Sequence, residues 1–163
     1  MTVTLRRGTV ADNDLIATLH HDVWHETQAE FQPDAVRRSR DLDYFRSRVA
    51  VFSTPPLVAV RAGGIVGFSG WDNNYIGQLY LVKSARRIGV GSQLLAETEQ
   101  MIFASGATHA RLVVIAGNIG SRKFYEHHGW AVVSEQPLQV DTSEGPVEVG
   151  AWHMRKQLRG AGK

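Results

Sequence analysis

The residues between a predicted strand and a predicted helix form the segment of this sequence with the clearest chemical meaning. Arg86 and Arg87 follow an apolar stretch, and Gly89 and Gly91 open an amphipathic run. The first turn of a helix has amide groups without partners inside the helix and carries a partial positive charge. Glycines let an anion reach that backbone, and guanidinium groups add donors. The segment therefore predicts a binding site for a diphosphate group.

Two known phosphate-binding motifs do not fit this segment. No Gly-Lys-Ser/Thr follows the glycines, so the segment is not a Walker A loop. Leu94 occupies the position of the third glycine in Gly-x-Gly-x-x-Gly. A loop with two turn glycines and two solvated arginines would have the same sequence, and that structural interpretation stays open. The position between a strand and a helix is what favours an anion site.

Two histidines four residues apart, His21 and His25, have the spacing of a helical zinc pair. Asp22 stands where the pattern His-Glu-x-x-His has glutamate, and its side chain is shorter by one methylene group. No third ligand is evident, so an exposed helix face is the favoured interpretation and no metal site is predicted. A zinc hydrolase built on these histidines is kept as an alternative, which metal analysis of the purified protein would test.

Length and composition are those of an ordinary globular domain. The 163 residues are 43% hydrophobic and 21% charged, with a net charge of +2. The absence of cysteine excludes disulfides, cysteine-ligated metals and a cysteine nucleophile. The charge is too small to predict nucleic-acid binding, and no apolar run reaches the roughly 18 residues that a membrane span needs. Because the first residues lack the order of a signal peptide, we expect a cytoplasmic protein.

Hydrophobic periodicity predicts the elements that position these residues. Strands are expected at residues 2–6, 57–61, 65–71, 75–82, 111–116, 130–134 and 147–154, and helices at 12–25, 89–105 and 121–128, with one or two shorter helices within 33–51. Asp12 is the expected N-cap of the first helix. A loop with Pro137 and Gly145-Pro146 joins the last two strands. The strand–helix–strand unit in the middle predicts one parallel pair in a mixed sheet. We expect one domain over residues 1–158 and a disordered tail over 159–163.

Two motifs in these elements resemble the GCN5-related N-acetyltransferase family. Arg86-x-x-Gly89-x-Gly91 is similar to the acetyl-CoA motif of that family, Gln/Arg-x-x-Gly-x-Gly/Ala. Residues 118–130 are similar to its segment Asn-x-x-Ala/Ser-x-x-x-Tyr-Glu-x-x-Gly-Phe. The resemblance is sharp over residues 75–130. It implies the acyl-CoA N-acyltransferase fold, an α/β (α+β) architecture with a mixed, mostly antiparallel central sheet of about seven strands, a V-shaped splay and flanking helices.

The resemblance also implies how acetyl-CoA, the cosubstrate of the family, is bound. The cofactor lies where strands 75–82 and 111–116 separate, and a bulge is expected in the first of them, which Gly77 could permit. Backbone atoms of 81–83 pair with the pantetheine arm, and amides of 87–92 hold the diphosphate. The expected cofactor-binding residues are Leu81, Val82, Lys83, Arg86, Arg87, Ile88, Gly89, Val90, Gly91, Ser92, Asn118, Ser121 and Tyr125.

Acyl transfer from a thioester to an amine gives two of these residues a chemical role. The oxyanion that forms needs a donor already in place, and an unpaired backbone N–H at the bulge, near Leu81, would serve. The departing thiolate needs a proton, which a phenol with a pKa of about 10 still holds at neutral pH. In the family the tyrosine matching Tyr125 lies near the sulfur, so Tyr125 is the expected general acid. A half-buried packing tyrosine is its structural alternative.

The nucleophile must be a neutral amine, and here the sequence departs from the family pattern. Tyr75 stands where many members have glutamate. Asp72, Tyr75, His25, Glu26 and water all stay open as proton acceptors. In the family, the region after the first helix lines the acceptor site. The expected acceptor contacts are Trp24, His25, Thr27, Phe31 and Tyr75.

The expected reaction is transfer of an acetyl group from acetyl-CoA to a primary amine of a small molecule. Without cysteine no acetyl-cysteine intermediate forms, so direct attack in a ternary complex is the simplest route. A protein lysine or N-terminus as acceptor stays open, as does a catalytically silent acyl-CoA-binding sensor. Family members often pair through their terminal strands, so a homodimer is a further expectation.

Overall fold

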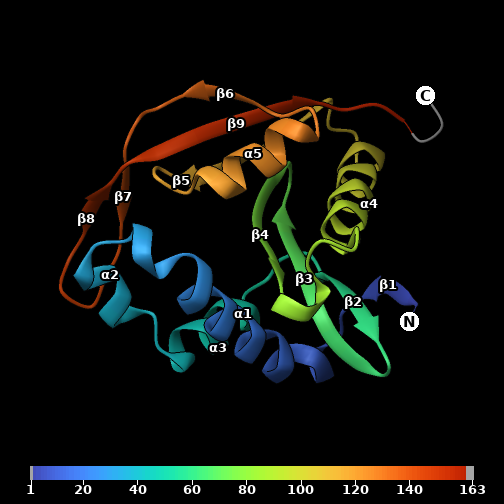
Figure 1. Cartoon of the computed structure of the whole chain (residues 1–163), viewed down its shortest axis with the longest axis horizontal. Coiled ribbons are helices and arrows are strands. Elements are labelled where there is room, and N and C mark those ends of the chain that lie inside the picture. Colours follow the sequence, from blue (N-terminus) through green and yellow to red (C-terminus); the bar gives the residue numbers. More distant parts are fainter. Residues whose placement is uncertain (1, 161–163) are drawn as a thin grey trace.

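A mixed seven-stranded sheet forms the centre of the computed structural model, which describes residues 2–160 (Figure 1). The strands of this sheet are β1 (Val3–Arg7), β2 (Leu57–Arg61), β3 (Gly64–Asp72), β4 (Tyr75–Leu81), β5 (His109–Ile115), β6 (Ala131–Ser134) and β9 (Ala151–Gln157). Their spatial order is β1-β2-β3-β4-β5-β9-β6, and β4–β5 is the parallel pair. The mixed, mostly antiparallel sheet of about seven strands is therefore confirmed. Of the predicted tail, residues 161–163 lie outside the described part of the chain.

Helices cover both faces of the sheet. They are α1 (Asn13–Thr27), α2 (Asp34–Ser39), α3 (Leu42–Ala50), α4 (Val90–Ala104) and α5 (Ile119–His127). Alternation along β2 separates the two layers, because successive side chains of a strand point to opposite faces. Leu57 and Ala59 pack with α4, whereas Val58 packs with α1 and α3. The helices α1 and α3 thus lie against one face, and α4 lies against the other.

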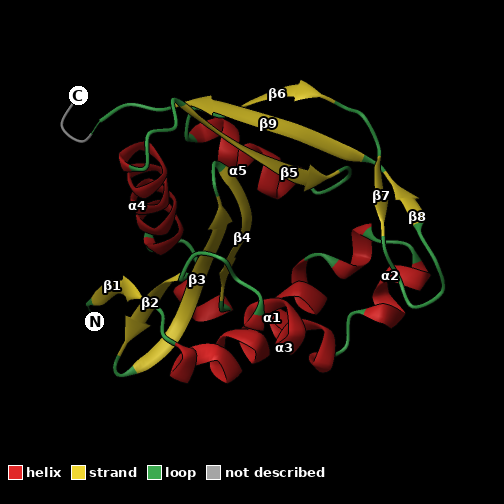
Figure 2. Ribbon diagram, turned by 180° about the vertical axis from the view of Figure 1, so that it is seen from behind, coloured by secondary structure: helices red, strands yellow, loops and turns green. Residues whose placement is uncertain are grey.

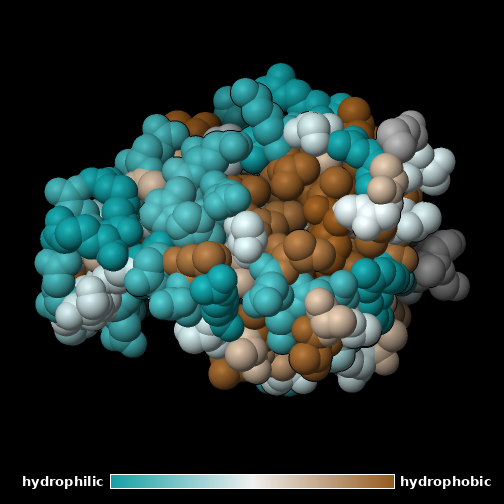
Figure 3. Space-filling view, turned by 90° about the horizontal axis from the view of Figure 1, so that it is seen from below, coloured by the Kyte–Doolittle hydropathy of each residue, from teal (hydrophilic) through white to brown (hydrophobic). Residues whose placement is uncertain are grey.

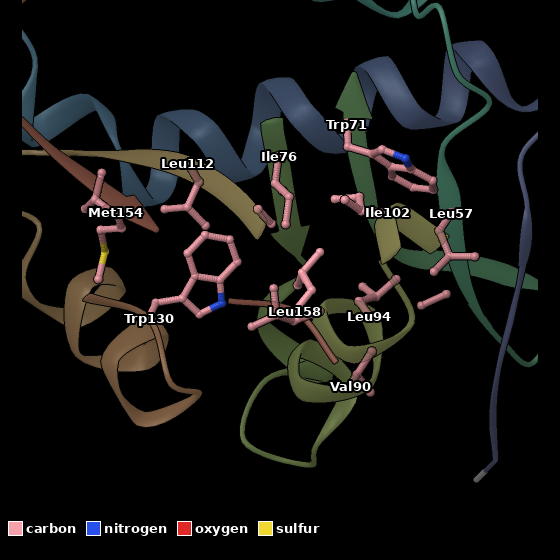
Figure 4. Close-up of a cluster of buried hydrophobic side chains, with 14 residues drawn as sticks. Leu57, Trp71, Ile76, Val90, Leu94, Ile102, Leu112, Trp130, Met154 and Leu158 are labelled. Carbon is pink, nitrogen blue, oxygen red and sulfur yellow. The ribbon is translucent and has the colours of Figure 1, made fainter. Parts of the chain in front are cut away.

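The larger core lies between α4 and the sheet (Figure 4). Leu94 and Ile102 of α4 are fully buried and contact strand residues such as Leu57 and Ile76. Trp130, just after α5, extends the same cluster toward β5 and β9. This core fixes α4 against the sheet. It thereby places the first turn of α4 beside the candidate site.

The strands β4 and β5 separate along most of their length (Figure 2). Their ladder consists of the single pair Tyr75↔Arg111, supported by the bond from the amide of Arg111 to the carbonyl of Asn74 at 2.9 Å. Beyond this pair the sheet opens into two halves, β1–β4 and β5-β9-β6. The V-shaped splay expected from the family resemblance is present, and it leaves one edge of β4 without a partner strand.

The bulge in β4 lies at Gly77. The register of β3 and β4 passes from Gly70↔Gln78 to Trp71↔Ile76, so Gly77 is the extra residue. A bulge was expected in this strand and is confirmed, but it lies four residues before Leu81 rather than near it. The open amide edge at Leu81 therefore comes from the splay and not from the bulge.

Residues 137–149 were predicted wrongly. They were interpreted as a loop and the start of a strand, but they form a separate hairpin of β7 (Leu138–Val140) and β8 (Val147–Val149).

Asp12 occupies the N-cap position of α1 as predicted, but its side chain makes no capping hydrogen bond. Its carboxylate binds the guanidinium of Arg6 at 2.9 and 3.0 Å and the amide of Thr9 at 2.8 Å. The two-pronged pair with Arg6 combines charge with geometry, which a single bond to a helix amide cannot match.

The surface carries one central hydrophobic area on the face shown in Figure 3, with hydrophilic residues around it. Between residues 2 and 160, no helix has both the length and the hydrophobicity needed to span a bilayer.

Candidate functional site

A large cavity lies between the first turn of α4, the end of β4, α5 and the C-terminal part of α1. Its volume is about 650 Å³, which is in the usual range for a small-molecule or cofactor site. It is lined by Val23, Thr27, Gln28, Leu79, Tyr80, Leu81, Arg86, Arg87, Gly89, Gly91, Ser92, Asn118, Gly120, Ser121, Phe124, Tyr125, His127 and His128. The two motif segments of the sequence, 86–92 and 118–125, thus face one another across this cavity.

The backbone at the start of α4 has the conformation that a phosphate cradle requires. Gly89 is the N-cap at φ +87°, and Arg87 also has a positive φ of +63°. A non-glycine residue in this region is uncommon and costs about 1 kcal/mol or more, so the surrounding fold must impose it. A Cβ added at Gly91 would lie 3.1 Å from Leu81 and 3.4 Å from Phe124. Gly91 is therefore needed for close packing of α4 on β4 and α5.

Most of the predicted cofactor residues line this cavity, and four do not. Leu81, Arg86, Arg87, Gly89, Gly91, Ser92, Asn118, Ser121 and Tyr125 lie on its wall. Val90 points into the core, Ile88 is exposed, and Val82 and Lys83 continue away from the cavity into a short 3₁₀ turn. The structure adds lining residues that the motifs do not specify. They are Gln28, which follows α1, and Phe124, His127 and His128 at unspecified positions of the segment 118–130.

The backbone of Leu81 faces the splay. Val82 is engaged with the sheet and the following turn, because its amide donates to Val66 at 2.9 Å and its carbonyl accepts from Ala85 at 3.0 Å. Opposed residues of an antiparallel pair alternate between bonded and non-bonded, so the N–H and C=O of the preceding residue, Leu81, point away from β3. No strand lies opposite them there, since β5 has already separated. The amide of Leu81 is therefore available to a ligand.

Arg86 connects this edge to α1. Its guanidinium donates to the carbonyl of Leu81 at 2.9 and 3.0 Å and forms an ion pair with Glu26 at 2.6 Å. The arginine side chain is about 30% exposed and lies on the cavity wall. An anionic ligand in the cradle would thus meet a guanidinium that already has one carboxylate partner.

The N-terminus of α5 is fixed from both sides. Asn118 is its N-cap and accepts from the amide of Ser121 at 3.2 Å, while its side-chain amide donates to Gln28, which follows α1, at 3.1 Å. This bond spans the open side of the splay. It holds the helix that carries Tyr125 at a fixed distance from the helix that borders the other side of the cavity.

Tyr125 is half-buried at the place where the sheet opens. Its ring packs edge-on against Trp130, with centroids 5.9 Å apart. Burial raises the pKa of the Tyr125 phenol, with a smaller contribution from Tyr75. The hydroxyl therefore stays protonated through the physiological range, as a proton donor must. All four tyrosines of the chain (Tyr44, Tyr75, Tyr80 and Tyr125) line this cavity or the two smaller ones next to it.

His128 caps the end of α5 and also contacts α4. Its Nδ1 donates to the carbonyl of Phe124 at 2.7 Å, as a C-terminal cap does. In the neutral ring the Nε2 is then an acceptor, and Ser92 lies 2.8 Å from it. The pair ties the first turn of α4 to α5 beside the cradle.

Two smaller cavities continue from the large one. The first, about 220 Å³, lies in the splay and shares Gln28, Leu79, Asn118 and Tyr125 with the large cavity. The second, about 230 Å³, lies beyond it against α2 and α3 and shares Trp24, Gln32, Tyr75 and Gly77 with the first. The three cavities therefore adjoin one another, in order from the start of α4 past the splay to the side of β4 that faces α2 and α3.

The predicted acceptor contacts are divided between these cavities. Trp24 and Tyr75 line both small ones, whereas Thr27 lines the large one. Phe31 packs over Gly117, and His25 donates from Nε2 to the carbonyl of Arg40 at 2.6 Å, so these two do not line a cavity.

The candidate bases are engaged elsewhere. Glu26 pairs with Arg86, and Asp72 accepts from Ser53 at 2.8 Å. Burial raises the pKa of the Tyr75 phenol, so less of this group is in the phenolate form that could accept a proton. Among the described residues, none of those lining the three cavities is an aspartate or a glutamate.

Several residues that line the cavity against α2 and α3 belong to no motif and were not predicted. They are His20, Gln32, Arg40, Tyr44, Arg48, Gln78 and Tyr80. His20 lies among the rings of Phe45, Phe68 and Tyr80, and burial lowers its pKa to about 3. The one available signal was the number of arginines between residues 37 and 48, which favoured a solvated helix face as much as a site.

His21 and His25, the pair with the spacing of a zinc site, stand 4.7 Å apart between ring centroids. His25 uses Nε2 for the Arg40 carbonyl, and His21 lies 2.8 Å from Asp22. Within residues 2–160 no group of three or more histidine, aspartate or glutamate side chains is placed to hold a metal ion.

Comparison with protein families gives one match. The model of the acetyltransferase (GNAT) domain matches residues 27–144, well over half of the chain. This range contains β4, the cradle, α4 and α5, which are the elements that build the large cavity. A search of curated proteins gives no match.

Several solved structures have the same fold. A GCN5-related N-acetyltransferase from Rhodopseudomonas palustris superposes with a TM-score of 0.78 at 20% identity, covering 97% of each chain. YncA from Salmonella typhimurium, solved with its cofactor acetyl-CoA, gives 0.69 at 19% identity over 100% of this chain and 98% of its own. A ribosomal-protein-alanine N-acetyltransferase from Brucella melitensis gives 0.68 at 24% identity over 95% and 99%. At these identities the likeness establishes the fold.

Proposed function

The chain belongs to the GNAT family of acetyl-CoA-dependent acetyltransferases, and we propose that it transfers the acetyl group to a primary amine of a small molecule by direct attack in a ternary complex. The observation that supports this proposal is the row of three adjoining cavities at the splay. In the proposed complex, acetyl-CoA and the amine occupy cavities on opposite sides of β4, and the reacting groups meet at its open edge. Cytoplasmic location and a homodimer stay predictions of the sequence.

The large cavity fits coenzyme A at its charged end. The unpaired amides in the first turn of α4, with Arg86 and Arg87 beside them, match a diphosphate in charge and in donor type. Acetyl-CoA supplies an acetyl group that is activated as a thioester. The open edge of β4 at Leu79 and Leu81 offers backbone groups to an extended chain, as an added strand would use them.

Leu81 and Tyr125 are the proposed catalytic residues. The amide of Leu81 points into the splay and donates to the oxygen on which negative charge develops. Tyr125 donates a proton to the departing sulfur from the opposite wall. Its raised pKa makes the phenol a weaker acid, but the same desolvation also raises the pKa of the departing thiol, so the two pKa values stay closer together than the shift of the phenol alone implies.

Water is the proposed carrier of the proton that leaves the amine. No carboxylate of the described residues lines the cavities, and Tyr75 stands at the usual glutamate position. His20 is a poor base, because its pKa of about 3 leaves it little affinity for a proton. The arginines of the acceptor cavity favour the neutral form of a nearby amine, since like charges disfavour the ammonium.

Calorimetric titration with acetyl-CoA, followed by a thiol-release assay with a panel of amines, tests the proposal. We expect binding of one acetyl-CoA per chain and release of free thiol that depends on an added amine. Absence of acetyl-CoA binding would refute the cradle, and binding without release for any amine would favour a silent sensor. Inclusion of lysine-containing and free N-terminal peptides in the panel separates a protein acceptor from a small one.

Replacement of Tyr125 by phenylalanine distinguishes an acid from a packing residue. We expect Tyr125→Phe to lower kcat by about 10²- to 10⁴-fold, because general acid catalysis contributes factors of this size. The Kd for acetyl-CoA should stay within about twofold, since the ring and its contact with Trp130 are kept. An unchanged kcat would assign Tyr125 to packing alone. Because burial raises the pKa of Tyr125, we also expect no loss of wild-type kcat from this group up to pH 10.

A further inference from the structure

The cavity of about 230 Å³ against α2 and α3 is called the distal cavity here. It contains a buried cation without a counter-ion. Arg40 is 7% exposed, and its guanidinium lies 4.1 Å above the ring of Tyr44. Two of its nitrogens donate to the backbone carbonyl of Asp141, at 3.2 and 3.3 Å. This carbonyl is neutral and satisfies only part of the five donors of a guanidinium. Buried charges in proteins are normally paired, so the environment of Arg40 lacks an anion.

A second arginine lines the same cavity. Arg48 of α3 is close enough to His20 and Tyr75 for its charge to lower the pKa of both groups, although burial dominates both shifts. Within residues 2–160, no ion pair joins Arg40 or Arg48 to a carboxylate. Neighbouring arginines differ in this respect, since Arg46 pairs with Asp43 and Arg38 with Glu144.

An unpartnered polar atom lies between this cation pair and the splay. Gln32 is 9% exposed, and its Oε1 is the buried side-chain atom without a hydrogen-bond partner among the described residues. The residue lines both small cavities. A buried acceptor without a donor costs free energy, and a ligand N–H placed in the cavity would remove that cost.

From these groups we propose that the acceptor is a small amine bearing a carboxylate, such as an amino acid. This inference rests on the proposed function. The carboxylate binds Arg40 and Arg48 in the distal cavity. The amine lies toward Gln32 and the splay, where the open edge of β4 holds the thioester.

The size of the cavity, and the hairpin at its edge, favour a small molecule over a protein. Its volume is about 230 Å³. The β7–β8 hairpin, which contributes Val140, is fixed onto α2 by the two-pronged pair Arg38–Glu144, with both distances 2.8 Å. A bond of 2.9 Å between Ser39 and Ser143 adds to this connection. The hairpin therefore forms a wall that a folded protein would have to displace.

Matched acceptors provide the first test. The thiol-release assay is run with amino acids and with the amines that lack only the carboxylate, for example L-phenylalanine against 2-phenylethylamine and L-leucine against 3-methylbutylamine. We expect kcat/KM for at least one amino acid to exceed that of its matched amine by about 10- to 100-fold, the range of a charge-assisted bidentate contact. Equal or better turnover of the neutral amines, or turnover confined to peptide amines, would overturn the inference.

Substitution of Arg48 tests whether the cation pair is responsible. We expect Arg48→Gln to raise KM for the amino acid about tenfold or more, with KM for the matched amine and the Kd for acetyl-CoA unchanged. Arg46→Gln is the matched control, because it removes the same charge from the same helix, outside the cavity, and should change none of these values. An equal rise of KM for both acceptors in Arg48→Gln would contradict the inference.

Arg40 is buried, so its loss could unfold the protein. Arg40→Lys keeps the charge and removes the two-pronged geometry. We expect it to bind acetyl-CoA normally and to lose preference for the amino acid over the matched amine. Retention of the full preference would overturn the role of Arg40. If the wild type bound no acetyl-CoA, or showed no turnover with any amine, the proposed function itself would be refuted. That result differs from a loss of preference for amino acids, so failure of the inference and failure of the proposed function can be told apart.

Discussion

The proposed coenzyme side of this protein, at the large cavity, and the proposed acceptor side, at the cavity against α2 and α3, are built in different ways. On the coenzyme side, the ligand is offered backbone groups: the first turn of α4 after Gly89, and the amide edge of β4 at Leu81. On the acceptor side, side chains from α1, α2, α3, β4 and the β7–β8 hairpin converge, among them Gln32, Arg40 and Arg48. One side therefore depends on local chain conformation, and the other depends on packing between distant segments.

This difference explains what each side can tolerate. A backbone site needs glycines at fixed spacing and is sensitive to any added side chain. A side-chain site can change its ligand through single substitutions while the sheet stays the same. Under the proposed assignment, the same fold could keep one coenzyme while its amine acceptor changes.

The largest effect is expected when the backbone side is overfilled. Gly91→Val should weaken acetyl-CoA binding by about 10- to 100-fold. The added Cβ would lie 3.1 Å from Leu81 and 3.4 Å from Phe124, and overpacking of this kind costs about 1–3 kcal/mol. Calorimetric titration measures the change. Gly64→Ala, where the nearest atom to an added Cβ is 3.8 Å away, is the control and should bind normally. Normal acetyl-CoA binding by Gly91→Val would show that the backbone side tolerates an added side chain, contrary to the comparison drawn above.

The acceptor side should be the more sensitive of the two to acid. His20 is neutral in the fold, with a pKa lowered to about 3 by burial, against 6.5 in an unfolded chain. Between these values the unfolded state binds one more proton, so the free energy of unfolding should fall by about 1.4 kcal/mol per pH unit as pH decreases from 6.5 toward 3. His20→Leu should lack this component.

Urea unfolding of both proteins between pH 7 and 4 isolates the effect of His20, since contributions from other groups cancel in the difference. His127→Gln changes an exposed histidine and serves as the control, with the same pH dependence as the wild type. If the free energy of unfolding changed with pH equally in the wild type and in His20→Leu, the acid sensitivity would come from groups other than His20.

The smallest effect is expected at the border between the two sides. Glu26→Gln removes the carboxylate that pairs with Arg86. Because partly exposed ion pairs contribute about 0–1 kcal/mol, acetyl-CoA should bind up to about fivefold more tightly, and less so at high salt. Glu126→Gln removes a charge that pairs with Arg122 on α5 and should leave the Kd unchanged. Weaker binding of acetyl-CoA by Glu26→Gln would mean that Glu26 positions Arg86 rather than competing for it.

The coenzyme side was predictable from the sequence because its chemistry is local. The spacing of Arg86, Gly89 and Gly91 marked the helix start, and Asn118 and Tyr125 occupy fixed positions on one short helix. The order and type of the main elements followed from hydrophobic periodicity. Gly77 was named as the residue that could permit the bulge, and the bulge lies there. The separation of the bulge from Leu81 did not follow, because register depends on how β3 pairs with β4 and not on the sequence of one strand.

The acceptor side could not be predicted in the same way. Arg40 and Arg48 read as surface charges within a polar stretch, and only the fold places them in a common cavity with Gln32. The β7–β8 hairpin was missed because Pro137 and Gly145-Pro146 indicate turns, and three-residue strands leave too short a pattern to detect. Contacts between segments about a hundred residues apart, such as Arg38 with Glu144, have no signature in either segment.

The β7–β8 hairpin stands apart from the seven-stranded sheet and pairs only within itself. Insertions or deletions in it would leave every register of the main sheet intact. They would nevertheless move Leu138 and Val140, and with them the boundary of the acceptor cavity. In evolution or in the laboratory, exchange of this one short segment is thus a route to new amine specificity that leaves the acetyl donor unchanged.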